Sequence, residues 1–328
     1  MTGPFAISVG HKYSYLSPPE GPVSMLARIQ QAITIVIVAA ALSWAISRVM
    51  AGHPLSAFAG AALIGTAYAF FLAAEFCALR LSAADGATPP ATLKQLARAW
   101  LAEVSAAPLT FCWRQPFRSA RWPDHLPAGA GGRRGVLLVH GFFCNRGFWN
   151  GWLARLTEAD VPTIAITLEP IFGSIDSYAA VIEAAVSELE RRTSTPPIVV
   201  AHSMGGLALR RWYRDQPRAD RIASVITIGT PHHGTLMARL AFSENGRQMR
   251  VGSKWLRDLC ELEDASRYGQ FTCFYSNCDN IVFPPSTATL RGARNRHLEA
   301  YPHVHLAAHP EIWVELASQL SDLTSTIS

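Results

Sequence analysis

The chain has 328 residues, of which 49% are hydrophobic and 16% are charged, so it can bury a sizeable core and carries fewer charges than an ordinary soluble domain. Its net charge is +5 at pH 7, but the Lys and Arg residues are scattered and form no long basic run, which argues against a nucleic-acid-binding protein and fits an anionic membrane surface better. The low charge content indicates that lipid surrounds part of the chain.

Two predominantly apolar stretches follow near the N-terminus, at about 29–50 and 55–79, and each is close to the roughly 20 residues that cross a bilayer core. The link 48–54 contains a glycine and a proline, which predicts the tight turn of a helical hairpin. We therefore expect residues 1–82 to form a membrane anchor of two transmembrane helices, with Glu75 reaching the interface or facing the partner helix. A cleaved signal peptide and a buried helix pair of a soluble protein are the alternatives.

Basic residues flank the hairpin at both of its open ends and are sparse in its turn. Lys12 and Arg28 precede the first stretch, several arginines follow the second, and the turn holds only Arg48 and a histidine. The positive-inside rule then places both chain ends on the cytoplasmic side of a bacterial inner membrane.

Residues 83–134 are rich in Pro, Gly, Ala and Arg, and we expect them to form a connector. One amphipathic helix is predicted at 92–104, packed on the following domain or lying along the membrane surface. Its apolar side chains recur at helical spacing, at Leu93, Leu96, Ala97, Trp100 and Leu101.

From residue 135 to residue 328, short apolar runs alternate with helical patterns. The runs are almost continuously Val, Ile and Leu, which is typical of strands buried on both faces of a parallel sheet. In such a sheet, functional residues gather in the turns after the carboxyl ends of the strands. The expected strands are 135–141, 163–170, 197–203, 222–231 and 271–282, and the expected helices are 148–159, 175–192, 205–215 and 311–323.

The turn after the third of these strands reads AHSMGG (201–206) and carries a serine between small residues. Ala201 and Gly205 lie two positions before and after Ser203, the spacing of a sharp strand-to-helix elbow that holds a nucleophilic hydroxyl at a helix N-terminus. The alternative is a tight turn that merely contains a serine.

The turn after the first strand supports the chemical interpretation. His140 and Gly141 follow the strand directly, so the backbone N–H of Phe142 can face the same site as the N–H of Met204. Two such donors would stabilise an oxyanion. We expect the His140 side chain to be structural.

An acid and a histidine follow Ser203 in the order that this architecture requires. Asp279 comes where the fifth strand ends, although a lone Asp there is also typical of an Asx turn. His303 would be the general base, oriented by Asp279, with His305 as the reserve candidate. If this segment is extended, the two histidines share a face and only one reaches Ser203. The neighbouring histidines lack the accompanying ligands of a zinc site, and we expect no metal.

These motifs together resemble the α/β-hydrolase superfamily, and within it bacterial lipases and esterases of the Bacillus type. AHSMGG resembles their Ala-x-Ser-x-Gly elbow, YSNCDNIV their acid segment and HVHL their His-x-x-Leu, which selects His303. TIGTPHHGT (227–235) resembles a turn that supports the site in such hydrolases. The resemblance implies a mostly parallel sheet with helices on both faces and a triad of Ser203, Asp279 and His303, with no cofactor.

The segment at about 234–268 lies between the fourth and fifth strands, and we expect it to form a small cap over the site. Its apolar residues would either line an acyl pocket or pack in the core of the cap, namely Leu236, Met237, Leu240, Phe242, Met249, Trp255 and Leu256.

The sequence thus predicts a membrane-anchored serine ester hydrolase whose partners are the bilayer and an ester substrate, and the anchor and the apolar cap favour an acyl-lipid ester over a small one. The alternatives are an inactive hydrolase-fold scaffold, and a thioesterase or acyltransferase that uses the same triad.

Overall fold

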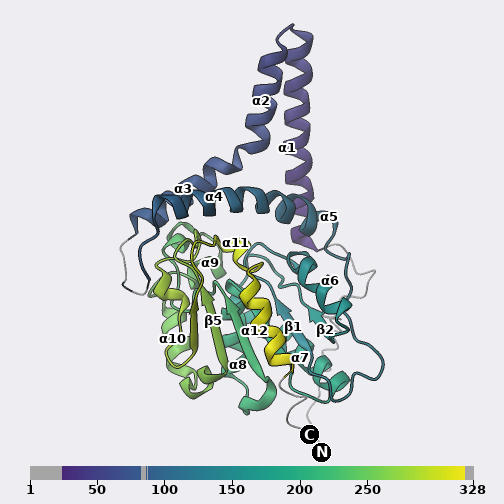
Figure 1. The fold of residues 1–328 in the computed structure, drawn as a ribbon, viewed down its shortest axis with the longest axis vertical. Coiled ribbons are helices and arrows are strands. Elements are labelled where there is room, and N and C mark those ends of the chain that lie inside the picture. The colour runs from purple at the N-terminus through teal and green to yellow at the C-terminus, as the bar shows by residue number, and fades with distance from the viewer. Residues whose placement is uncertain (1–23, 83–85, 87, 322–328) are drawn as a thin grey trace, which may run out of the picture.

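The computed structural model describes residues 24–82, 86 and 88–321, and its centre is a six-stranded parallel sheet. Lys12 and the rest of the chain before Ser24 lie outside the described residues. The sheet order is β2-β1-β3-β4-β5-β6, and all neighbouring strands pair in parallel (Figure 1). The strands are β1 Val136–Val139, β2 Thr163–Ala165, β3 Ile198–His202, β4 Ser224–Ile228, β5 Phe271–Tyr275 and β6 Arg294–His297.

Five strands lie within the stretches expected from the sequence, whereas β6 was missed. Its four residues are polar, and all but the last are exposed at the edge of the sheet. Edge strands face water on one side and need no apolar run, so hydrophobicity could not indicate this one. The parallel sheet predicted from the apolar runs is confirmed.

Helices cover both faces of the sheet, as expected. Along β1, Val136 and Leu138 face a core with α6 (Asn150–Glu158) and α12 (Pro310–Ser321). Leu137 and Val139 face the opposite core. That core contains α7 (Ala179–Thr193), α8 (Met204–Arg214) and α10 (Lys254–Leu262).

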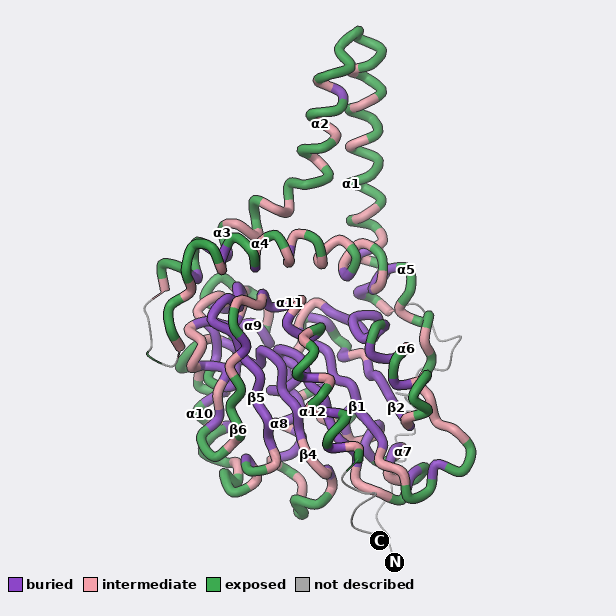
Figure 2. Tube along the Cα trace, in the orientation of Figure 1, coloured by how far each residue is buried: buried purple, intermediate pink, exposed green. Residues whose placement is uncertain are grey.

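The helices α1 (Met25–Met50) and α2 (Pro54–Thr66) form an antiparallel pair that projects from this domain (Figure 1). Most of their side chains are exposed, in contrast to the buried strands (Figure 2). Of the described helices, α1 alone is long and apolar enough to cross a membrane by itself. Trp44 Nε1–H donates to the Ser56 carbonyl (2.9 Å) and ties the two helices together.

The second span expected at 55–79 is not one continuous helix, and as a membrane span it stays a prediction. It consists of α2 and α3 (Tyr68–Leu81), which are bent by 47° relative to each other. Gly65 lies beside the break, where a residue without a side chain weakens the helix. Beyond the break, polar contacts hold α3 on the domain: Tyr68 Oη–H donates to the Val104 carbonyl (2.8 Å), and Glu75 accepts from Asn280 (2.6 Å).

The connector packs on the hydrolase-like domain, which was one of the two expected arrangements. Helix α4 (Leu93–Ala107) lies with α3 across the end of the sheet from which α1 projects (Figure 1). Thr92 and Gln95 close its N-terminus in a capping box, which stabilises a helix start. Buried side chains of α3 and α4 form one cluster with the loop after β5, at Phe76, Leu79, Leu96, Ala99, Cys278 and Phe283.

The segment between β4 and β5 is helical, as expected for a cap. It contains the 3-10 turns Leu236–Leu240 and Ala265–Gln270, with α9 (Glu244–Gln248) and α10 between them. Short helical segments elsewhere are a π-helical turn Pro108–Arg114, α5 Gln115–Phe117, 3-10 turns at Arg146–Trp149, Ile175–Tyr178, Ala219–Arg221 and Pro285–Ala288, and α11 His303–Leu306.

Candidate active site

Ser203 lies in the sharp turn between β3 and α8, with backbone angles of φ 54° and ψ −130°. A side chain at Gly205 would place its Cβ 2.5 Å from the His140 carbonyl oxygen, and one at Gly206 would place it 2.2 Å from Thr230 Oγ1. Only small residues therefore allow β3 and α8 to meet at this angle. The strained serine is a feature expected at a functional site.

The structure brings Ser203, His303 and Asp279 together in one hydrogen-bonded chain. Ser203 Oγ lies 2.9 Å from His303 Nε2, and His303 Nδ1 lies 2.9 Å from Asp279 Oδ2. Asp279 Oδ1 accepts the backbone N–H groups of Ile281 (2.9 Å) and Val282 (2.7 Å). The carboxylate is thus fixed by the turn that follows β5 and points one oxygen at the imidazole.

The electrostatic surroundings favour the protonated form of His303. Burial is the largest single influence and lowers the pKa of this imidazole, but Asp279 at hydrogen-bond distance and the carboxylates of Glu103 and Glu75 together outweigh it. The net result is a pKa of His303 raised above 6.5. Gly229, with φ +55°, leaves room for the pair, since a Cβ there would lie 2.9 Å from Asp279 Oδ2.

The segment that carries His303 and His305 is the helical turn α11, so the expected extended segment is wrong. Positions two apart in a helix point in different directions. His303 accordingly faces Ser203, whereas the His305 ring packs near Tyr301, with ring centroids 5.6 Å apart. Pro302 at the start of the turn is a residue that favours helix initiation.

The loop after β1 lies directly against the serine. A Cβ at Gly141 would lie 2.6 Å from the Ser203 Cβ, so this position has no room for a side chain. His140 is buried and structural, as expected: Nδ1–H donates to the Gly141 carbonyl (2.9 Å) and Nε2 accepts from Leu168 N–H (3.0 Å). Burial lowers the pKa of His140 to about 4, which keeps it neutral in this role.

Phe142 and Met204, the two residues expected to supply oxyanion donors, belong to the two turns that meet at Ser203. Phe142 follows Gly141, and its ring lines the same cavities as Ser203. Met204 is the first residue of α8, so its N–H has no partner within the helix. The sharp turn and the close approach of Gly141 therefore place two backbone donors near the serine.

Sequence reasoning missed Glu103, which holds the turn carrying His303. Its carboxylate accepts the N–H groups of Val304 (2.9 Å) and His305 (3.2 Å) at the start of α11. Burial raises the pKa of Glu103 to about 7, against the lowering effect of those bonds and of His303. The sequence offered one indication of this role: Glu103 lies on the same helix face as Leu96 and Ala99, which are buried.

A second acid of the N-terminal helices, Glu75 of α3, reaches the same turn. Asn280 Nδ2–H donates to Glu75 (2.6 Å), and Asn280 Oδ1 accepts the His303 backbone N–H (3.1 Å). His202 Nε2 lies 3.1 Å from the His303 carbonyl oxygen. The turn that carries His303 is therefore held from three directions, and Glu75 faces the domain instead of a partner helix in a membrane.

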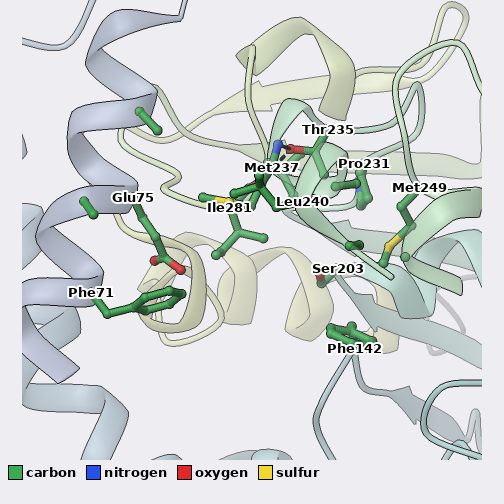
Figure 3. A pocket seen from close by; sticks show the side chains of 16 residues that line it. Phe71, Glu75, Phe142, Ser203, Pro231, Thr235, Met237, Leu240, Met249 and Ile281 are labelled. Carbon is green, nitrogen blue, oxygen red and sulfur yellow. Dashed lines mark hydrogen bonds between the residues drawn. The ribbon is translucent and has the colours of Figure 1, made fainter. Parts of the chain in front are cut away.

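Ser203 is buried, with 6% of its surface exposed, although a strand-to-helix elbow by itself presents its serine hydroxyl to solvent. It is covered by α3, and it lines two apolar cavities of about 430 and 620 Å³. Figure 3 shows the smaller cavity, with Phe71 and Glu75 of α3 facing Ser203 and Phe142 across it. Of the cap residues expected to line a pocket, Met237, Leu240 and Met249 do so.

The described part of the chain contains no group of three His, Cys, Asp or Glu side chains that could hold a metal ion. In the TIGTPHHGT turn, His232 makes hydrogen bonds within the domain. His232 is buried, its Nε2 lies 3.1 Å from Thr227 Oγ1, and its carbonyl accepts from Arg210 (2.8 Å).

The sheet order and the serine at the turn between β3 and α8 define an α/β hydrolase. A model of the Alpha/beta hydrolase family matches residues 136–322, so the chain belongs to this family. The comparison with curated proteins gives no match.

Two solved lipase structures show the same fold. The mature form of Bacillus licheniformis lipase BlEst2 matches with a TM-score of 0.53 and 17% identity, over 60% of this chain and 96% of that chain. Aspergillus fumigatus lipase B matches with a TM-score of 0.51 and 21% identity, over 60% of this chain and 55% of that chain. The family match begins at residue 136, so α1 to α5 lie outside it.

Proposed function

We propose that this protein is a serine ester hydrolase that acts through an acyl-Ser203 intermediate. The observation that carries the proposal is the hydrogen-bonded chain from Ser203 Oγ through His303 to Asp279. The two lipases of the same fold are consistent with this chemistry.

In the first half of the reaction, Ser203 Oγ attacks the ester carbonyl while His303 Nε2 takes the hydroxyl proton. The imidazolium then gives this proton to the alcohol oxygen as the carbon–oxygen bond breaks, which leaves the acyl group on Ser203. Asp279 fixes the tautomer and stabilises the imidazolium. In the second half, water attacks the acyl-serine, and His303 takes the water's proton and returns it to Ser203.

The N–H groups of Phe142 and Met204 would bind the oxygen that becomes negative at each tetrahedral stage. In comparable enzymes, losing one such donor costs about 2.7–4 kcal/mol of transition-state stabilisation. The chain's own residues suffice for these steps, and the proposal includes no cofactor or metal.

The test is covalent labelling with a fluorophosphonate probe together with hydrolysis of p-nitrophenyl butyrate by the full-length protein. Labelling of Ser203, and its loss together with hydrolysis in Ser203→Ala, would support the proposal. Ser187→Ala is the matched control, because Ser187 lies on the outer surface of α7 and contacts Glu183. An unlabelled parent protein would indicate a hydrolase-fold scaffold without activity, and turnover of thioesters or acyl transfer in preference to ester hydrolysis would favour those alternatives.

We also propose that α1 and α2 anchor the protein in a bacterial inner membrane, with the hydrolase domain on the cytoplasmic side. Support comes from the apolar, exposed surface of α1 and from the basic residues at the open end of the hairpin. Alkaline phosphatase and green fluorescent protein, fused in turn to the C-terminus, test the orientation. A fluorescent fusion with an inactive phosphatase supports it, and the reverse places the domain outside the cytoplasm.

A further inference from the structure

The two cavities beside Ser203 share part of their lining, and both are bounded by α3, the helix that follows the hairpin. Their volumes, about 430 and 620 Å³, are within the usual range of ligand pockets, roughly 300–1,000 Å³. Residues common to both linings include Ser203 itself, Phe142 and Ile281 of the hydrolase domain, and Phe71 and Glu75 of α3. A ligand with its reacting carbonyl at Ser203 can therefore extend into two apolar spaces.

The smaller space, here called the cap arm, runs from Ser203 under the cap (Figure 3). Its far wall consists of Met237, Leu240 and Met249, with Ala78 of α3 on the near side. These are adaptable or small apolar groups, which suit a hydrocarbon chain.

The larger space, here called the hairpin arm, runs from Ser203 toward the anchor. Its lining passes from His303 to Leu72 of α3 and ends at Gly65 of α2 and Ile37 of α1. The hairpin arm therefore reaches the level at which the two projecting helices diverge.

The environment of α1 changes just before this level. Gln30 and Gln31 still donate to backbone carbonyls of the domain, at Phe143 (3.4 Å) and Pro116 (2.6 Å). From Ile33 onward the large apolar side chains of α1 are exposed, and Ile37, one turn further, is both exposed by 37% and part of the cavity wall. In a membrane-anchored protein, this residue would contact lipid on one side and the hairpin arm on the other.

The charge of the lining selects among lipids. Among the described residues that line the two arms there is no Lys or Arg, whereas two carboxylates, Glu75 and Glu103, face the hairpin arm. A phosphate inside would find no Lys or Arg to pair with, since His303 is already paired with Asp279, and it would lie near like charges, which is unfavourable in an apolar site.

We propose that the substrate is a neutral ester lipid with hydrocarbon on both sides of the carbonyl, of the diacylglycerol class, which enters sideways from the bilayer between α1 and α3. One hydrocarbon part occupies the hairpin arm and the other the cap arm, with the carbonyl at Ser203. Hydrolysis then adds water across the ester bond and releases a fatty acid and a monoacylglycerol. The proposal rests on the proposed ester hydrolase function and specifies its substrate and entry route.

Gly65 offers a direct test, because a Cβ added there meets nothing within 4 Å and a large side chain can fill the mouth of the hairpin arm without displacing the backbone. Gly65→Trp is compared with Ala62→Trp, a similar addition at an exposed position of the same helix that lines neither arm. The full-length proteins are reconstituted in phosphatidylcholine vesicles that contain dioleoylglycerol. Water-soluble p-nitrophenyl acetate is measured in parallel.

We expect Gly65→Trp to lower dioleoylglycerol hydrolysis by about tenfold or more, the scale of steric discrimination in an apolar pocket, and to change p-nitrophenyl acetate hydrolysis by less than about twofold. Ala62→Trp should change neither. Equal rates of lipid hydrolysis in the parent and Gly65→Trp would overturn the entry route, and so would an equal loss with both esters while Ser203 is still labelled by fluorophosphonate.

The lipid class is tested with dioleoyl phosphatidylglycerol in place of dioleoylglycerol. Hydrolysis of the phospholipid at least as fast as that of the neutral lipid would overturn the charge argument. A parent protein that cleaves p-nitrophenyl acetate but not dioleoylglycerol would refute the substrate while leaving the proposed function intact, and one that cleaves neither would refute the proposed function itself.

Discussion

Replacing Glu103 with glutamine should make the protein more stable above neutral pH and slightly less stable in mild acid. The carboxyl is 1% exposed, and burial raises its pKa from 4.5 to about 7. In the unfolded chain the same group ionises near its ordinary pKa. Between these two values the folded protein binds a proton that the unfolded chain has lost, so stability falls as the pH rises through this window.

The size of the effect follows from the shift. A pKa raised from 4.5 to about 7 corresponds to roughly 3 kcal/mol of lost stability once the pH exceeds both values. Glutamine keeps one acceptor oxygen for α11 but has no charge to bury, and it loses one of the two bonds to Val304 and His305, worth about 1 kcal/mol. The Glu103→Gln variant should therefore gain up to about 2 kcal/mol at about pH 8 and lose about 1 kcal/mol at about pH 4.5.

Thermal unfolding of the full-length protein in one detergent across this pH range measures the difference. A change of 2 kcal/mol corresponds to a shift in Tm of roughly 4–8 °C for a domain of this size. Glu261→Gln, an exposed change of the same charge on α10, is the control and should show no such trend. A Tm difference between Glu103→Gln and the parent that is constant with pH, or that favours the parent at high pH, would show that the start of α11 accommodates the ionised carboxylate without penalty.

Three further predictions concern the site and the core. His303→Ala should abolish ester hydrolysis while His305→Ala retains most of it, and loss of activity in the second variant alone would refute the assignment of the base. His303 must be neutral to accept a proton, and its pKa is raised above 6.5. We therefore expect kcat/KM to fall as the pH falls through a midpoint above 6.5. A midpoint well below 6.5 would contradict the influence of the neighbouring carboxylates on His303. Arg210→Met should lower the free energy of unfolding by about 3–5 kcal/mol, because the Glu263 carboxylate would remain buried without the arginine that pairs with it. Arg218→Met, at a surface ion pair, should lower it by less than about 1 kcal/mol. Equal effects of the two variants in urea denaturation would show that burial of the ion pair does not matter.

The elements of the domain that contains the sheet were predictable wherever the backbone geometry of a position allows only one type of residue. The small residues around Ser203 are required by the angle between β3 and α8, and this requirement shows directly in the sequence. Asp279 was predictable because it follows a mostly apolar strand, β5, at the carboxyl end of the sheet. The polar edge strand β6 lacked any such signal.

The N-terminal contribution to the site was not predictable from local patterns. Apolar content alone suggested one span at 55–79, but the position of the bend depends on contacts such as that between Tyr68 and Val104, residues far apart in the chain. Glu75 was likewise assigned to other surroundings and Glu103 was not singled out, because their partners lie in the loop after β5 and in α11. The one indication of these contacts in the sequence was an acidic residue on a helix face that is otherwise apolar.

The bend between α2 and α3 fixes the mouth of the hairpin arm at a set depth relative to α1. For an enzyme built in this way, the relevant substrate concentration is a mole fraction among the surrounding lipids, and the volume of the solution does not enter. Turnover would then respond to dilution of the substrate by other lipids and to the lateral composition of the membrane. Each molecule would process the lipids of its own bilayer, without the adsorption and desorption steps of a lipase that arrives from water.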